Sequence, residues 1–158
     1  MREILFRGKR QDNGEWVEGC YCKYPHQFSG FLKDCIFTSW YDAKLVSSVE
    51  SGTCIAYPVD PETVGQYTGS IDENRTKIFE GDIVQAFTRY GTKHIYPIEY
   101  RDGTFWFGNW NWIEFLDRFQ FREVIGNIYD NPGLLGEPMK PASKKCCTER
   151  SCTCNGKF

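Results

Sequence analysis

The stretch VDPETVGQYTGSIDENRTKIFEGDIV, from Val59 to Val84, is crowded with turn-forming residues and ends in an apolar run. Asp60 is suited to cap a single helical turn that begins at Pro61. We expect an extended segment after Gly65, then a polar loop and a short strand. The tight turn Glu80–Gly81–Asp82 would then lead into the next strand. The stretch therefore predicts a junction between two β-rich lobes.

Short strands with turn signals between them are predicted on both sides of this junction. Apolar residues recur at period two or in short runs, which indicates strands, and we expect no long helix. The predicted strands cover approximately residues 4–9, 15–24, 30–40, 53–59, 83–90, 98–107 and 122–130.

The clearest hairpin is IEYRDGTFWF, in which Asp102-Gly103 separates two apolar runs. A two-residue turn of this type fixes the register, so Glu99 is expected opposite Trp106. Alternation then places four residues on the core face of the hairpin. These residues are Ile98, Tyr100, Phe105 and Phe107. Trp106 is expected on the opposite face.

These patterns predict an all-β protein in which an N-terminal β lobe, residues 1–68, packs on a C-terminal barrel. The Gly-Asp turn, hairpin and closing strand over residues 69–132 are typical of a small SH3-like barrel. From residue 133 to 158 the composition shifts to Gly, Pro, Lys, Ser and Cys, and we expect a flexible, disordered tail.

The charge of the chain is unevenly distributed. Five of the 19 Lys and Arg residues and one of the 21 Asp and Glu residues lie from Lys140 onward, which leaves a net charge of −6 for residues 1–139. An acidic body argues against a duplex-binding protein.

The sequence contains no apolar run that could span a bilayer and begins without a signal peptide, so we expect a cytoplasmic protein of a bacterial host cell.

Three blocks of the sequence resemble the YopX family of bacteriophage and prophage proteins. They are VGQYTG…KIFEGDIV, from 64 to 84, the opening REILFRGKRQDNGEWVEG, from 2 to 19, and EVIGNIYDNPGLL, from 123 to 135. The resemblance implies an N-terminal β lobe followed by an SH3-like barrel, and it supplies no activity or catalytic residue. Asn74 stands in a loop where the family usually has glycine, and we expect Asn74 to adopt the left-handed conformation.

Polar residues of the central block form one candidate site. Gln66, Tyr67, Glu80 and Asp82 lie among glycines. The simpler interpretation is that Gly65, Gly69 and Gly81 hold special backbone conformations while polar side chains bind turn amides.

Cysteines form a second candidate site. Four thiolates can bind zinc, and the tail residues Cys146, Cys147, Cys152 and Cys154 could do so, although their spacing differs from the usual paired arrangement. A thinner cluster consists of Cys20, Cys22, His26 and Cys35, for which buried free cysteines are the simpler explanation.

The aromatic segment FWFGNWNWIEF suggests a third site. Trp106, Trp110 and Trp112 could form an interaction surface for a protein or stack on bases of a single strand. Alternatively, Trp110 and Trp112 belong to a half-buried strand. The two histidines, His26 and His94, lie in no recognised catalytic spacing, so we do not expect an enzyme.

Together these observations favour a non-enzymatic protein-interaction or assembly module that binds a protein partner or a second copy of itself. Single-stranded nucleic-acid binding through the Trp-rich barrel is the alternative, and an enzyme is the third hypothesis.

Overall fold

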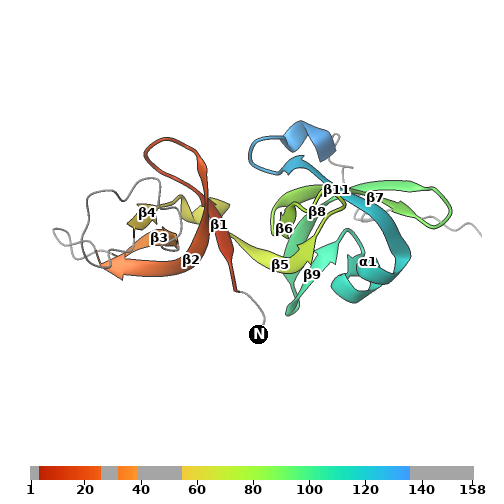
Figure 1. The fold of residues 1–158 in the computed structure, drawn as a ribbon, viewed down its shortest axis with the longest axis horizontal. Coiled ribbons are helices and arrows are strands. Elements are labelled where there is room, and N and C mark those ends of the chain that lie inside the picture. The colour runs from red at the N-terminus through yellow and green to blue at the C-terminus, as the bar shows by residue number, and fades with distance from the viewer. Residues whose placement is uncertain (1–3, 26–31, 39–54, 136–158) are drawn as a thin grey trace, which may run out of the picture.

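A computed structural model describes residues 4–25, 32–38 and 55–135 (Figure 1). Within these residues the chain forms two antiparallel sheets, one α-helix and two short 3₁₀ helices, which confirms the all-β class. Within the same residues, no helix is both long enough and apolar enough to cross a membrane.

The first sheet has six strands in the order β4-β3-β2-β1-β5-β6. Its strands are β1 (Phe6–Lys9), β2 (Trp16–Pro25), β3 (Leu32–Thr38), β4 (Ile55–Pro58), β5 (Gly65–Ile71) and β6 (Lys77–Phe79). The pairing of β1 with β5 is short and aligns Phe6 with Gln66 and Arg7 with Gly65. In Figure 1, β5 leads from the N-terminal strands to the second sheet.

The second sheet has five strands in the order β10-β9-β8-β7-β11. Its strands are β7 (Asp82–Thr88), β8 (Lys93–Arg101), β9 (Thr104–Phe107), β10 (Trp110–Asn111) and β11 (Phe119–Asn127). Helix α1 (Trp112–Arg118) connects β10 to β11, and the 3₁₀ helix η2 (Pro132–Leu135) follows β11. Closure of this sheet into an SH3-like barrel stays a prediction.

The main hydrophobic core lies between the second sheet, β6 and α1. It consists of Ile78, Val84, Ala86, Ile98, Phe105, Phe107, Phe115 and Phe119. Phe107 is fully buried, and its ring centroid lies 4.5 Å from that of Phe115 and 5.1 Å from that of Phe119. Burial of each such ring stabilises the fold by about 2–3 kcal/mol.

The register predicted for the β8–β9 hairpin is confirmed, with Glu99 opposite Trp106 and Ile98 opposite Phe107. The expected burial of Tyr100 is wrong, because its side chain is 51% exposed. The reason is that β8 pairs with β7 only as far as Pro97 and with β9 from Ile98 onward. Tyr100 therefore lies at the edge of the core, where its ring contacts that of the buried Phe105.

The junction that the opening stretch predicts contains the expected helical turn. The 3₁₀ helix η1 covers Pro61–Thr63, and the Asp60 side chain accepts a hydrogen bond from the Glu62 amide, 3.1 Å away. The predicted lobe boundary after residue 68 falls inside β5, and η2 includes the first residues of the predicted tail. Residues 136–158 lie outside the described part of the chain.

The loop between β5 and β6 differs from the expectation by one residue. Arg75, not Asn74, has a positive φ, of 65°. Asp72 accounts for this turn, because its Oδ1 accepts hydrogen bonds from the amides of Asn74 and Thr76, both at 2.8 Å. Its Oδ2 accepts another from the Val124 amide, at 3.1 Å, which ties the loop to β11.

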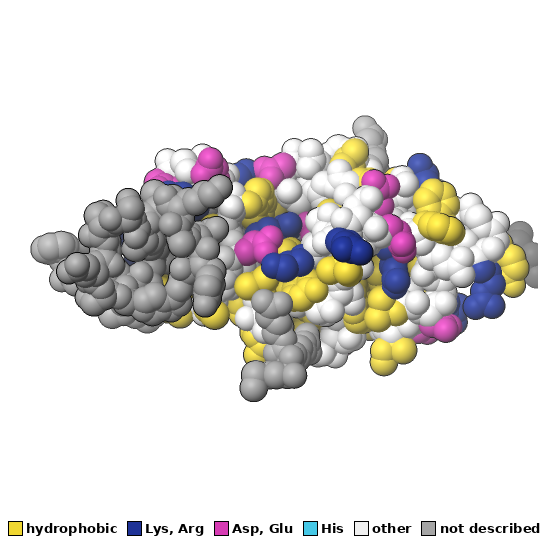
Figure 2. All heavy atoms as spheres, viewed as in Figure 1, with side chains coloured by type: hydrophobic (Ala, Val, Ile, Leu, Met, Phe, Trp, Pro, Cys, Tyr) yellow, Lys and Arg dark blue, Asp and Glu magenta, His cyan; other side chains and the backbone are white. Residues whose placement is uncertain are grey.

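The surface carries charges of both signs. On the face that Figure 2 shows, basic and acidic side chains are interspersed with apolar ones over the described residues, without a continuous basic stripe.

Candidate functional site

The Glu80–Gly81 turn brings distant parts of the chain close together. Gly81 has a φ of +84°, and a Cβ atom there would lie 3.1 Å from the Tyr129 ring. A Cβ atom at Gly65 would lie only 2.4 Å from the carbonyl oxygen of Glu80. Both positions therefore require glycine, one for its backbone angle and one for the close approach of another strand. Gly69 also has a positive φ, as the simpler interpretation of the motif expects.

Asp82 links this turn to the N-terminal strands. Its side chain is 1% exposed, and its oxygens accept hydrogen bonds from the Phe79 amide at 2.7 Å and the Arg7 guanidinium at 2.6 Å. Burial raises the pKa of Asp82, and the positive charge of Arg7 opposes this rise. Arg7 lies 4.6 Å from the centroid of Trp16 and 4.7 Å from that of Phe79, so its guanidinium contacts two aromatic rings.

A second polar contact joins β1 and β2 to the segment after β11. Asp130 accepts hydrogen bonds from Lys9 at 2.5 Å, from the Trp16 indole at 2.7 Å and from the Asn127 amide group at 3.0 Å. These donors, Lys9 first, lower the pKa of Asp130 to about 2. Trp16 also packs on Tyr129, with a centroid distance of 5.7 Å.

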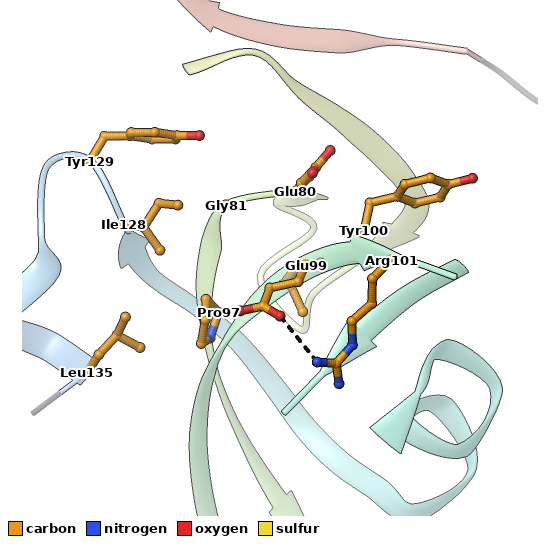
Figure 3. A pocket seen from close by; sticks show the side chains of 10 residues that line it. Glu80, Gly81, Pro97, Glu99, Tyr100, Arg101, Ile128, Tyr129 and Leu135 are labelled. Carbon is orange, nitrogen blue, oxygen red and sulfur yellow. Dashed lines mark ion pairs between the residues drawn. The ribbon is translucent and has the colours of Figure 1, made fainter. Parts of the chain in front are cut away.

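Beside these contacts lies an open groove of ≈ 490 Å³, which we call the Glu80 groove (Figure 3). It is lined by Glu80, Gly81, Pro97, Ile98, Glu99, Tyr100, Arg101, Ile128, Tyr129 and Leu135. In Figure 3, Tyr129 and Tyr100 lie on either side of Glu80. The groove thus combines apolar and aromatic walls with a few polar groups, which is typical of binding sites.

The carboxylate of Glu80 is half-buried, and burial raises its pKa. The contributions that oppose this rise come from the backbone N–H groups of Gln66 and Tyr100. Glu99, in contrast, pairs with Arg101 at 3.7 Å, as the dashed line in Figure 3 shows. Burial also raises the pKa of Tyr129, and the negative charge of Glu80 adds to that effect.

A second, smaller hollow of ≈ 220 Å³ shares Tyr100 with the Glu80 groove. Its lining is Gln66, Thr68, Tyr100, Gly103, Thr104, Phe105 and Trp112. Thr68 donates a hydrogen bond to the Ile78 carbonyl group at 2.8 Å, which fixes the wall that β5 contributes. Two residues singled out from the sequence, Gln66 and Glu80, therefore lie near Tyr100, whereas Tyr67 is buried against Phe79.

The three tryptophans of the predicted aromatic surface do not share one face. Register places Trp106 opposite Asn111 and Trp110 opposite Phe107, so Trp106 is on the outer face and Trp110 on the core face. Trp106 lies under the Arg101 guanidinium, 4.5 Å from it. Trp110 and Trp112 pack against the core.

The strand expected through Trp110 and Trp112 is wrong beyond residue 111, because α1 begins at Trp112. The Asn111 side chain accepts hydrogen bonds from the amides of Ile113 and Glu114, at 3.1 and 3.0 Å. The Glu114 carboxylate accepts one from the Asn111 amide in return, at 3.3 Å, which completes a capping box.

Among the residues that the structure describes, cysteines and histidines form no metal site. Among the described residues, no three His, Cys, Asp or Glu side chains are grouped to hold a metal ion. Cys35 is buried, as the simpler explanation expects, whereas Cys20 is exposed. His94 packs against Trp110 and Phe119 at 5.2 and 5.3 Å. His26 and the tail cysteines lie outside the described residues, so their zinc binding stays a prediction.

The fold and the central motif agree with a comparison against protein-family models, in which the model described as YopX protein matches residues 5–136. The chain belongs to the YopX family. Other comparisons add little to this YopX assignment. A comparison with curated proteins found no match. Among solved structures, the chain is similar to the crystal structure of protein EF1440 from Enterococcus faecalis, with 21% identity and a TM-score of 0.49. That match covers 85% of this chain and 99% of the other.

Sequence reasoning on this YopX chain missed two residues of the groove and its surroundings. Tyr129 appeared only as part of a strand, yet its ring covers Gly81 and forms one wall. Arg7 appeared only in the first strand, yet it neutralises Asp82. The one usable signal was the presence of both residues in the blocks that resemble the family.

Proposed function

We propose that this YopX protein is a non-enzymatic protein-interaction module, which acts as a phage accessory protein in the bacterial cytoplasm and binds a protein partner through the Glu80 groove. The observation that carries the proposal is the groove itself. Its walls present the exposed side chains of Tyr100 and Leu135 to solvent. Exposed aromatic and apolar side chains around a concavity are typical of protein-binding sites.

The charges of the groove favour a protein over a nucleic acid as the partner. Of its three charged lining residues, Glu99 and Arg101 pair with each other, so the negative charge of Glu80 remains, and a carboxylate repels a phosphate backbone. The mixture of charges on the face in Figure 2 supports the same choice.

The test is a pull-down of the tagged full-length protein from phage-bearing host cells, with quantitative identification of proteins and nucleic acids. Tyr100→Ala removes one wall of the groove, and Tyr90→Ala is the matched control, because Tyr90 is 87% exposed in the turn between β7 and β8. We expect a nuclease-resistant protein that is retained by wild type and Tyr90→Ala and lost by Tyr100→Ala. Equal retention by all three would contradict the proposal.

Single-stranded nucleic-acid binding remains the alternative, for which the stacked Arg101 and Trp106 pair is the favourable observation. Under this alternative, nucleic acid is captured, and its retention falls steeply as the salt concentration is raised.

Self-association is the other form of the assembly hypothesis. Sedimentation of wild type and Tyr100→Ala over a range of concentrations would distinguish it from binding to a different protein.

A further inference from the structure

The Glu80 groove contains an acidic group that has no cationic partner among the described residues. Within the described part of the chain, Glu80 forms no ion pair, whereas Asp82 pairs with Arg7 and Glu99 with Arg101. Burial of an ionised carboxylate without a cation costs free energy. A carboxylate held in this state inside a groove is suited to bind a positive charge that arrives with a partner.

The groups around Glu80 extend this preference. The rings of Tyr100 and Tyr129 lie on either side of it in Figure 3, and aromatic faces attract cations. Besides burial, the negative charges of Glu80, Asp60 and Glu62 raise the pKa of Tyr129 and the positive charge of Arg7 lowers it, so carboxylates outnumber cations at this end of the groove. Pro97 and Ile128 supply apolar walls that suit the hydrocarbon stem of a long basic side chain.

We propose that the Glu80 groove binds a lysine or arginine side chain of a peptide segment, with Glu80 as its counter-ion and Tyr100 and Tyr129 as its aromatic walls. This inference rests on the proposed function, which makes the groove the binding surface, and adds the chemistry of the partner. A metal ion is a poorer occupant, because no group of three potential ligands exists among the described residues.

The test uses three capped tripeptides with the full-length protein: acetyl-Leu-Lys-Leu-amide, acetyl-Leu-Arg-Leu-amide and acetyl-Leu-norleucine-Leu-amide. Norleucine has the stem of lysine without its charge. Binding is followed by the NMR shifts of the backbone amides of Gly81, Tyr100 and Ile128. For such small ligands we expect dissociation constants on the order of millimolar for the two basic peptides.

The norleucine peptide is expected to bind about tenfold more weakly, which corresponds to the loss of one charge-assisted contact. Glu80→Gln should abolish the preference for the basic peptides. Asp117→Asn, which removes the same charge from the exposed surface of α1, should retain it. The dispersion of the NMR spectrum reports in each case whether the variant is folded.

Three results would overturn the inference: equal binding of the norleucine peptide, no effect of Glu80→Gln, or no shift of the groove amides with any peptide. If all three peptides bind equally and still shift the groove amides, the proposed function stays intact, since the groove then binds peptides without regard to charge. Failure of the proposed function is detected separately, by retention of the same proteins in the Tyr100→Ala pull-down.

Discussion

Replacement of Asp82 by alanine is expected to lower the free energy of unfolding more than any surface substitution, because it leaves Arg7 without a counter-ion. The Arg7 side chain is only 14% exposed and lies between the rings of Trp16 and Phe79. Water therefore has little access to the guanidinium group that loses its partner. The same change removes the hydrogen-bond acceptor of the Phe79 amide.

The magnitude follows from these two losses. Removing one partner of a buried ion pair typically costs about 3–5 kcal/mol. A buried amide without an acceptor costs about 1–3 kcal/mol. The two effects overlap, because the same carboxylate serves both donors, and we expect a total of about 4 kcal/mol. The double variant Arg7→Met/Asp82→Ala leaves no buried cation without a partner. Its loss in free energy of unfolding should therefore be about 2 kcal/mol smaller than the sum of the losses in the two single variants.

Urea unfolding followed by far-UV circular dichroism measures these differences. Asp12→Ala is the control, because Asp12 also pairs with an arginine, Arg10, but is 61% exposed. Its unfolding midpoint should stay close to that of wild type. A loss below about 1 kcal/mol for Asp82→Ala, or strict additivity in the double variant, would refute the argument that the pair is a desolvated link between the lobes.

Three further predictions concern other contacts. Gly65→Ala should lower the free energy of unfolding by about 1–3 kcal/mol because its Cβ would meet the Glu80 carbonyl, whereas Gly133→Ala, with open space around it, should be neutral in the same urea assay. Asp130 has a lowered pKa, so its stabilisation is present above pH 4 and lost as pH falls towards about 2; a series of unfolding curves over this range should show the loss, and Asp130→Asn should flatten it. Asn111→Ala should cost about 1 kcal/mol through the lost cap of α1, measured by thermal unfolding, and an unchanged midpoint would contradict the capping role.

Local chemistry made parts of the fold predictable. The Asp102-Gly103 turn admits few geometries, and it gave the register of β8 and β9 correctly. Asp60 and Pro61 likewise identified η1. Helix α1 was missed because alternating Trp and Asn residues imitate a strand. The readable signal was Asn111 followed three residues later by Glu114, the pattern of a capping box.

The candidate site was less predictable because its residues come from distant parts of the chain. Alternation correctly placed Tyr100 on the same face as Phe105, but it could not show that Tyr100 lies at the edge of the core. That limit depends on where β8 leaves β7 for β9, which is a tertiary property. The wall formed by Tyr129 depends in the same way on the return of the chain after β11.

Strand β5 has a practical consequence for anyone who wishes to divide this protein into fragments. It pairs with β1 on one side and with β6 on the other. A fragment that ends at Thr68 would carry a truncated strand, and its complement would keep the pair of Ile71 with Lys77 but leave the Phe79 end of β6 uncovered. Bare edges recruit strands from other molecules, so both pieces would tend to aggregate. Expression of the two halves as separate polypeptides should therefore fail at this cut, whereas co-expression could restore a complete sheet.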